Sequence, residues 1–387
     1  MTIKVNSQAS VLVAATVASA LIASSANASH FRGAALVPSV DENGVLTVTS
    51  KSFWRKGTAS AGIGSSVSVT GASNAVEISS TLDTSDVRRD SNTEEFQTTL
   101  PGAGFYTITW NGCCWVRPGP SQNYTESSYA TTSTIYWDGS NATNPIQFDL
   151  ENIQQQVVGG QAYSDNLDVV GSTALSYDTS YVSLNMTSQA EGFTIDGTGQ
   201  ITIDATSTGN YVDNPFAASV GADEAFSARI TASDGINPNE NSSVEFVWLF
   251  DVVDSQAANL APSINDIVIN ALVGDSISET LVVTDPNAGD VLTTSFLSFL
   301  GAGGAVAGST FDPNTLEFNW DSSGFAAGSY VATFRTIDNG GLSDQGTVTI
   351  NLSNRQTNPT VSEPSTFAIA GLGILGLVAV RRRRKAK

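Results

Sequence analysis

Histidine and cysteine are almost absent from this chain of 387 residues, and each absence excludes a class of chemistry. His30 is the only histidine, so a serine or cysteine nucleophile has a single candidate imidazole base, and a zinc site built from several histidines is excluded. We interpret His30 as a structural residue of the first strand. The only cysteines, Cys113 and Cys114, are neighbours, so a framework of disulfides that holds distant loops together is also excluded.

Three states stay open for Cys113 and Cys114. Neighbouring Cα atoms are about 3.8 Å apart across a trans peptide, whereas an ordinary disulfide prefers about 4.4–6.8 Å. The alternatives are a vicinal disulfide ring, two free buried thiols and bridges between molecules, and we favour the ring. The intact mass before and after alkylation distinguishes these states.

Positive charge is scarce outside the two ends of the chain. Lysine and arginine number 17 against 37 acidic residues, which gives a formal net charge of −20. Six of the basic residues follow Val380 and one is Lys4, so only ten lie in between. A surface this acidic repels nucleic acid and anionic lipid, so we expect no nucleic-acid partner. Helix formers are also few, and the many Ser, Thr, Val and Gly residues predict an exported all-β protein.

The first 28 residues have the pattern of a secretory signal peptide. Lys4 supplies a positive start, and residues 11–23 form an apolar segment that is too short for an ordinary membrane-spanning helix. Ala26 and Ala28 give the small-x-small pattern of a cleavage site, which predicts that the mature chain begins at Ser29.

The other end of the chain combines a short polar motif, an apolar run and a basic stop. The apolar run at 367–380 is 14 residues long, whereas an ordinary spanning helix needs about 20. The four arginines that follow can extend the effective span by snorkelling, and such clusters stay on the cytoplasmic side. We therefore expect a short C-terminal hydrophobic helix, with everything before Pro364 outside the cytoplasm.

This tail resembles the PEP-CTERM sorting signal of Gram-negative bacteria over residues 362–387. The residues that carry the resemblance are Glu363, Pro364, Ser365, Thr366, Gly371, Gly373, Gly376, Arg381, Arg382, Arg383 and Arg384. Ser362 stands where the family has its first proline. The resemblance implies recognition by exosortase, a membrane-bound cysteine transpeptidase-like enzyme, followed by removal of the tail. The precursor would then be held only transiently in the inner membrane before it reaches the outer envelope, the cell surface or the extracellular matrix.

Between the two signals, the pattern of alternating strands and Gly or Asn turns predicts three β units. The first, at 29–142, is expected to be a β-sandwich, and those at 143–254 and 259–353 to be immunoglobulin-like or cadherin-like sandwiches. The second and third are interpreted as a diverged internal repeat. Residues 354–362 then form a short polar stalk.

Two further resemblances support this division. The start Ser29-His30-Phe31-Arg32-Gly33 and the segment 104–114, which ends in the doubled cysteine, resemble the N-terminal module of bacterial surface proteins that precedes such repeats. No activity follows from that resemblance. The turns 285–290 and 338–343 in the third unit resemble those of bacterial cadherin-like and immunoglobulin-like repeats.

No cofactor is expected, although calcium is possible as a bound metal. Asp285, Asp290 and Asp338 lie in predicted turns at acidic positions of cadherin-like repeats, and Asp266 in the linker is a further candidate ligand. Hard cations prefer carboxylate and carbonyl oxygens. The alternative is that these carboxylates cap the backbone of their own turns.

The aromatic residues of the first unit allow two interpretations. Exposed rings of Trp54, Trp110, Trp115 and Trp137 would suit stacking on sugars, particularly near the loop 115–129, and buried rings would form the core. We favour an exported structural or adhesion protein of the cell surface or exopolysaccharide, without catalytic activity. Its expected partners are exosortase and extracellular polysaccharide or other surface proteins. The alternatives are a secreted polysaccharide-active enzyme and a carbohydrate-binding or ice-binding module.

Overall fold

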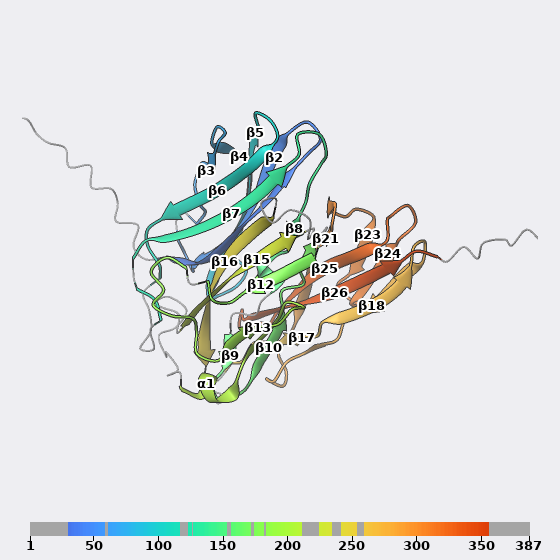
Figure 1. Ribbon diagram of the computed structural model, residues 1–387. Coiled ribbons are helices and arrows are strands. Elements are labelled where there is room, and N and C mark those ends of the chain that lie inside the picture. Colours follow the sequence, from blue (N-terminus) through green and yellow to red (C-terminus); the bar gives the residue numbers. More distant parts are fainter. Residues whose placement is uncertain are drawn as a thin grey trace, which may run out of the picture.

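The computed structural model describes residues 30–355 except for 59–60, 117–122, 126, 153–155, 172–173, 182, 211–223, 234–240 and 254–258. Within these ranges the regular structure is almost entirely strand, which confirms the predicted all-β class (Figure 1). The helical elements are α1 (Ala205–Asn210) and the single turn η1 (Leu150–Asn152). The signal peptide with Ala26 and Ala28, the stalk beyond Arg355, the apolar segment 367–380 and the sorting residues lie outside the described part.

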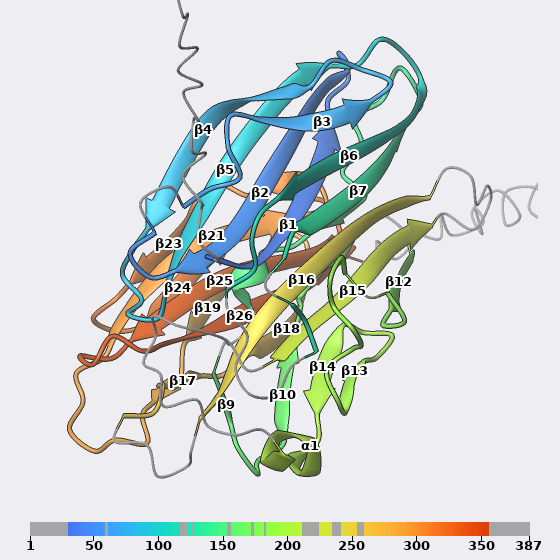
Figure 2. The same cartoon turned by 90° about the vertical axis from the view of Figure 1, so that its left-hand side faces the viewer.

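The first unit is a sheet that closes on itself around a hydrophobic core (Figure 2). Among the described strands its order is β1-β2-β5-β4-β3-β6-β7-β16, and β16 pairs with β1 again. In β2 and β7 every second side chain is buried, as expected for strands with one face on a core. The strands are β1 (Phe31–Val40), β2 (Val45–Arg55), β3 (Ser66–Thr70), β4 (Ala75–Asp83), β5 (Arg89–Thr99), β6 (Gly104–Gly112), β7 (Tyr129–Trp137) and β16 (Ser242–Val253).

The second and third units share one strand topology, which confirms the predicted repeat. In the second unit β8 pairs with β11, β9 runs parallel to β16, and two further sheets have the orders β10-β14-β13 and β12-β15-β16. In the third unit β17 pairs with β20, β18 runs parallel to β26, and the matching orders are β19-β24-β23 and β21-β25-β26.

The bounds of these strands complete the described fold. The second unit contains β8 (Ile146–Gln147), β9 (Gln156–Val158), β10 (Tyr163–Asn166), β11 (Val170–Gly171), β12 (Ala174–Asp178), β13 (Phe193–Ile195), β14 (Gln200–Ile203) and β15 (Glu224–Ser233), besides β16. The third contains β17 (Ser263–Ile264), β18 (Ile267–Leu272), β19 (Ser276–Thr280), β20 (Val283–Thr284), β21 (Thr293–Gly301), β22 (Gly304–Ala305), β23 (Ser309–Asp312), β24 (Glu317–Asp321), β25 (Gly328–Ile337) and β26 (Ser343–Ser353).

Strand β16 belongs to two units at once. It pairs with β15 of the second unit along most of its length, and it also pairs with β1 and β7 of the first. Gly33 permits the crossing, because a Cβ there would lie 2.6 Å from the carbonyl oxygen of Val247. The hydrogen-bonded sheet therefore runs across the boundary that the sequence places at residue 142.

The third unit folds back against the other two. Figures 1 and 2 both show its strands beside the earlier units. The amide of Val87 donates a hydrogen bond of 2.9 Å to the carbonyl of Gly341. Nearly all of β25 and β26 is buried on both faces, because one face covers the core of the third unit and the other meets its neighbours.

Candidate functional site

The three aspartates that the sequence singles out come together in the third unit. Asp285 and Asp290 lie in the loop between β20 and β21, and Asp338 follows directly after β25. Their nearest carboxylate oxygens all lie within 4.8 Å of one another. No lysine or arginine of the described chain forms an ion pair with any of the three.

The hydrogen bonds of this acidic cluster leave one buried carboxylate oxygen without a partner. Asp285 Oδ1 accepts the amide of Asn287 at 2.6 Å, while Asp285 Oδ2 is buried with no hydrogen-bond partner. Asp338 accepts the amide of Leu342 and the side-chain amide of Asn259, both at 2.9 Å. These residues fit a hard cation, because oxygen donors converge and one buried carboxylate oxygen is otherwise unsatisfied.

Asp266 does not join this cluster. Its Oδ1 atom accepts the amide of Thr347 at 2.8 Å and faces Asp168 of the second unit instead. The prediction that Asp266 contributes a ligand is therefore wrong, because its carboxylate, directly before β18, is bound to Thr347 of β26. Beside the acidic cluster, a cavity of about 340 Å³ lies between the segment that connects β9 to β10 and a wall formed by Leu260 and Pro286.

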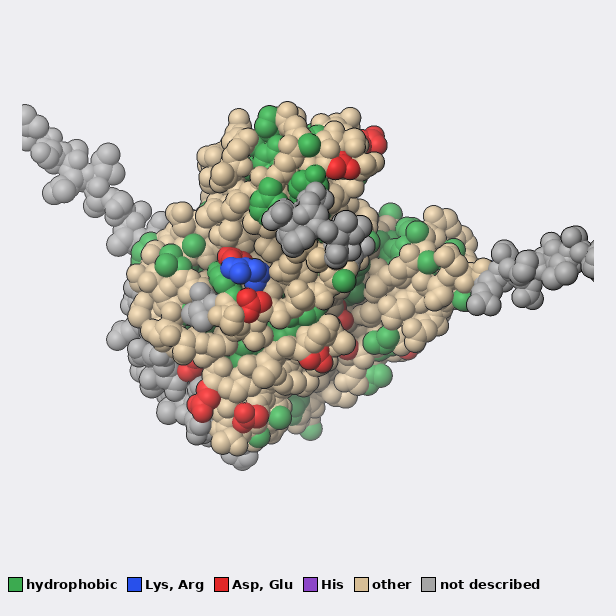
Figure 3. Space-filling model, viewed as in Figure 1, with side chains coloured by type: hydrophobic (Ala, Val, Ile, Leu, Met, Phe, Trp, Pro, Cys, Tyr) green, Lys and Arg blue, Asp and Glu red, His purple; other side chains and the backbone are tan. Residues whose placement is uncertain are grey.

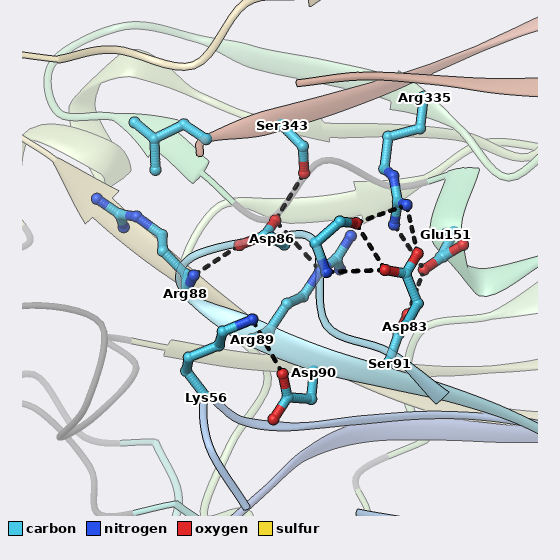
Figure 4. Close-up of polar contacts among 12 residues, drawn as sticks. Lys56, Asp83, Asp86, Arg88, Arg89, Asp90, Ser91, Glu151, Arg335 and Ser343 are labelled. Carbon is cyan, nitrogen blue, oxygen red and sulfur yellow. Dashed lines mark hydrogen bonds and ion pairs between the residues drawn. The ribbon is translucent and has the colours of Figure 1, made fainter. Parts of the chain in front are cut away.

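A second charged site, which the sequence did not suggest, joins all three units (Figure 4). At its centre Arg335 of β25 contacts Asp83 of the first unit, and its Nη1 atom lies 3.7 Å from Glu151 Oε1 of the second. Arg335 Nη2 also donates to Ser85 Oγ at 2.9 Å. Since Arg335 is only 5% exposed, its guanidinium depends on these partners for its solvation.

Besides Arg335, two further cations lie near Glu151, namely Lys51 and Arg89. Lys51 Nζ lies 2.9 Å from Glu151 Oε2, and Ser91 Oγ donates to Oε1 at 2.7 Å. Burial opposes the ionisation of Glu151, but the charges of Lys51, Arg89 and Arg335 outweigh it and lower the pKa of Glu151 to about 2. Glu151 is therefore a carboxylate at neutral pH.

Arg89 and Asp86 extend the network to the start of β26. Asp86 Oδ2 lies 3.6 Å from Arg89 Nε and accepts a hydrogen bond of 2.6 Å from Ser343 Oγ. The guanidinium carbon of Arg89 lies 4.6 Å from the ring centre of Phe53 and 5.5 Å from that of Trp248. This stacking supports a cation that is almost completely buried.

Arg32 connects the N-terminal motif to the same region. It is fully buried, and its Nη2 atom lies 2.9 Å from Asp251 Oδ1 of β16. Arg88 Nη1 lies 3.2 Å from the other oxygen of Asp251. We call the residues in these contacts the junction network: Arg32, Lys51, Asp83, Asp86, Arg88, Arg89, Glu151, Asp251 and Arg335.

The two halves of the N-terminal resemblance lie in contact. The amides of His30 and Phe31 both donate to the carbonyl of Cys114, at 3.1 and 3.2 Å. Cys113 and Cys114 are joined by a disulfide, and Cys113 is exposed. His30 pairs with Arg55, and burial together with the Arg55 charge lowers the pKa of His30. These contacts hold His30 and the doubled cysteine at the start of β1.

The aromatic residues of the first unit form core rather than an open platform. Phe31 stacks on Tyr129 with ring centres 3.7 Å apart, and Trp54, Trp110 and Trp115 pack around this pair. All five are buried, as is Trp137. Stacking of these tryptophans on a sugar is therefore excluded. Of the loop 115–129 that was expected near such a site, residues 117–122 and 126 lie outside the described part.

The junction network explains where the scarce positive charge is located. Arg32, Lys51, Arg88, Arg89 and Arg335 are five of the nine described basic residues. On the face of the molecule seen in Figure 3, acidic side chains are scattered and basic side chains form one small spot. A signal was present in the sequence, because Arg88 and Arg89 stand between acidic residues in a chain with few cations.

Comparisons with solved structures give remote likenesses. A fragment of Drosophila N-cadherin is 11% identical, with 61% of this chain and 79% of that chain covered and a TM-score of 0.22. Extracellular domains of protocadherin gamma B2 are 13% identical, with 84% and 78% covered and a TM-score of 0.21. An immunoglobulin-domain pair from the Drosophila receptor protein tyrosine phosphatase DLAR is 11% identical, with 54% and 99% covered and a TM-score of 0.21. We draw no functional conclusion from likenesses at this level.

The family comparison concerns the C-terminal tail. A search of curated proteins found none that matches the chain. In the described part of the chain, no helix has the length and apolar character to cross a membrane. Residues 360–384 match the model of the PEP-CTERM protein-sorting motif, as the residue pattern predicted. The chain therefore carries the PEP-CTERM motif, which marks exported proteins that are anchored transiently at the membrane.

Proposed function

We propose that this chain is a structural or adhesion protein of the bacterial cell surface that exosortase processes and that has no catalytic activity. The observation that carries the proposal is the sorting motif at 360–384, which follows an acidic all-β body. In the described part of that body, the basic side chains and His30 are engaged in contacts between or within the units. Extracellular polysaccharide or other surface proteins are the proposed partners.

The proposal is tested by following the full chain with an epitope inserted after Gly303, at an exposed hairpin tip between β21 and β22. We expect the epitope outside the cells in a strain with exosortase, and a heavier form in the inner membrane when exosortase is deleted. Pro364→Ala should also stay in the inner membrane, whereas Pro359→Ala, a matched change in the stalk, should not. An epitope that remains in the cytoplasm would refute export, and turnover of a matrix polysaccharide by the purified protein would refute the non-catalytic role.

A calcium ion at the acidic cluster is a second proposal, supported by the unsatisfied oxygen of Asp285. Asp285, Asp290 and Asp338 would hold the ion, and Asn259 would link the site to the preceding unit through Asp338. Because Asn259 precedes β17, a bound ion would stiffen the connection between the second and third units.

Thermal unfolding of the full chain in calcium and in chelator tests this second proposal. Calcium at 100 times its Kd stabilises a folded state by about 2.7 kcal/mol, so the unfolding midpoint should rise. Asp285→Asn should abolish the rise, whereas Asp312→Asn, which removes an exposed charge at the end of β23, should retain it. Equal midpoints for the unaltered chain in calcium and chelator would exclude a bound ion.

A further inference from the structure

The outer face of β26 is a docking surface for both earlier units. Alternate residues of a strand share a face, so Ser343, Thr347 and Thr349 point to the same side. Ser343 contacts Asp86 of the first unit, and both threonine hydroxyls contact Asp168 of the second. From the sequence alone this threonine face would be assigned to solvent.

Asp168 and Asp266 compete for one hydroxyl proton at this surface. Thr347 Oγ1 lies 2.7 Å from Asp168 Oδ2 and 3.1 Å from Asp266 Oδ1, and Thr347 is only 1% exposed. A hydroxyl has one proton to donate. If both carboxylates were ionised, the hydroxyl oxygen of Thr347 would therefore contact one carboxylate oxygen with no proton between the two atoms. One additional proton resolves the conflict: Asp168 then donates to Thr347 Oγ1, and Thr347 donates to Asp266.

The remaining contacts identify Asp168 as the carboxyl that carries this proton. Burial raises the pKa of Asp266 as well, but Asp266 also accepts the Thr347 amide at 2.8 Å, which opposes that rise and favours its ionised form. Burial and the charge of Asp266 raise the pKa of Asp168 to about 7, although hydroxyl donors from Thr347 and Thr349 oppose that rise.

The groups around this cluster supply no compensating positive charge in the described chain. No lysine or arginine forms an ion pair with Asp168 or Asp266 there. The titratable groups that face the cluster are Tyr177 on β12, Tyr163 on β10 with its partner Asp165, and Asp344 on β26. Burial raises the pKa of Asp344 to about 7 as well.

We propose that Asp168 is a proton-dependent latch that closes the third unit onto the second in acid and releases it as the pH rises. The carboxyl has its ordinary pKa near 4 when the units separate and a higher pKa when they dock, so docking takes up a proton. Docking is therefore strongest below about pH 4 and weakens as the pH rises toward 7.

Labelling of a cysteine at Thr333 in the full-length chain, held in mild detergent, measures the opening. Thr333 pairs with Thr347 across β25 and β26 and is 1% exposed, and β11 of the second unit packs against β25. The labelling rate at each pH is divided by the rate for the urea-unfolded chain. We expect protection to fall roughly tenfold between pH 5.5 and 7.5 in Thr333→Cys.

Two added substitutions decide whether Asp168 causes the change. Asp168→Asn donates a hydrogen bond without titrating, and asparagine tolerates the left-handed φ of 48° at this position, so protection should stay constant with pH. Asp266→Ala frees the Thr347 hydroxyl for Asp168 and should reduce the pH dependence, whereas Asp312→Asn should leave it unchanged. Equal protection at both pH values in Thr333→Cys, or an undiminished fall in either added variant, would overturn the proposal.

Discussion

Removal of Arg335 should release the third unit from the junction network at a measurable cost in stability. The guanidinium is 5% exposed and contacts Asp83 and Glu151, so Arg335→Ala leaves two carboxylates with less positive charge. Breaking a buried ion pair on one side typically costs 3–5 kcal/mol. Glu151 keeps Lys51 at 2.9 Å, so we expect the lower end of that range, about 3 kcal/mol.

Urea unfolding followed by tryptophan fluorescence measures this cost. Arg355→Ala is the matched control, because Arg355 also pairs with an aspartate of the third unit, Asp275, but does so at the surface. Exposed pairs contribute about 0–1 kcal/mol, so the control should unfold almost as the unaltered chain does. If Arg335→Ala lost less than about 1 kcal/mol, or no more than Arg355→Ala, the junction network would not hold the units together.

Three further predictions follow from the same contacts. Gly33→Ala should destabilise the chain by about 1–3 kcal/mol in urea unfolding, because its Cβ would lie 2.6 Å from the backbone of β16. Gly102→Ala, where a Cβ meets nothing within 4 Å, should be near neutral. Equal effects of the two substitutions would contradict the close approach of β1 and β16 at Gly33. Because the pKa of Glu151 is lowered to about 2, its contribution to the free energy of unfolding is present above about pH 4 and lost as the pH falls through 2. Glu151→Gln should therefore weaken the dependence of the free energy of unfolding on pH between 4 and 2. An unchanged dependence in this range would contradict an ionised Glu151 in the junction network. Without reductant, the intact mass should show no alkylation at Cys113 or Cys114, and two added groups would exclude the disulfide.

The periodicity of the sequence was sufficient to predict strands and the repeat. Alternation in segments such as 45–49 and 347–352 marks one buried face, and matched Phe and Asp positions aligned the second unit with the third. The alternation of polar and apolar residues shows which face of a strand is buried, but it does not show which other strand or unit covers that face. It therefore missed that β16 completes the first sheet and that the threonine face of β26 docks on Asp168.

The candidate sites show the same division between local and long-range information. Asp285 and Asp290 share one turn and Asp338 begins another, so local turn chemistry and the family resemblance placed all three. The junction network joins residues as far apart as Asp83 and Arg335, and its members come from strands, from the loop between β4 and β5 and from η1, none of which has a distinctive local pattern. Such pairs depend on how whole units pack, which no local spacing encodes. Asp266 was misassigned for the same reason, since its partner Thr347 lies on a distant strand.

The most direct test of this account is small-angle X-ray scattering on the processed protein recovered from outside the cells, at pH 5.5 where the latch is closed. A chain whose first two units share β16 and whose third unit closes on the junction network should scatter as one compact body, with a radius of gyration of about 20 Å for a chain of this length. A much larger radius, with the profile of three units in a line, would contradict the docking of the third unit on the other two.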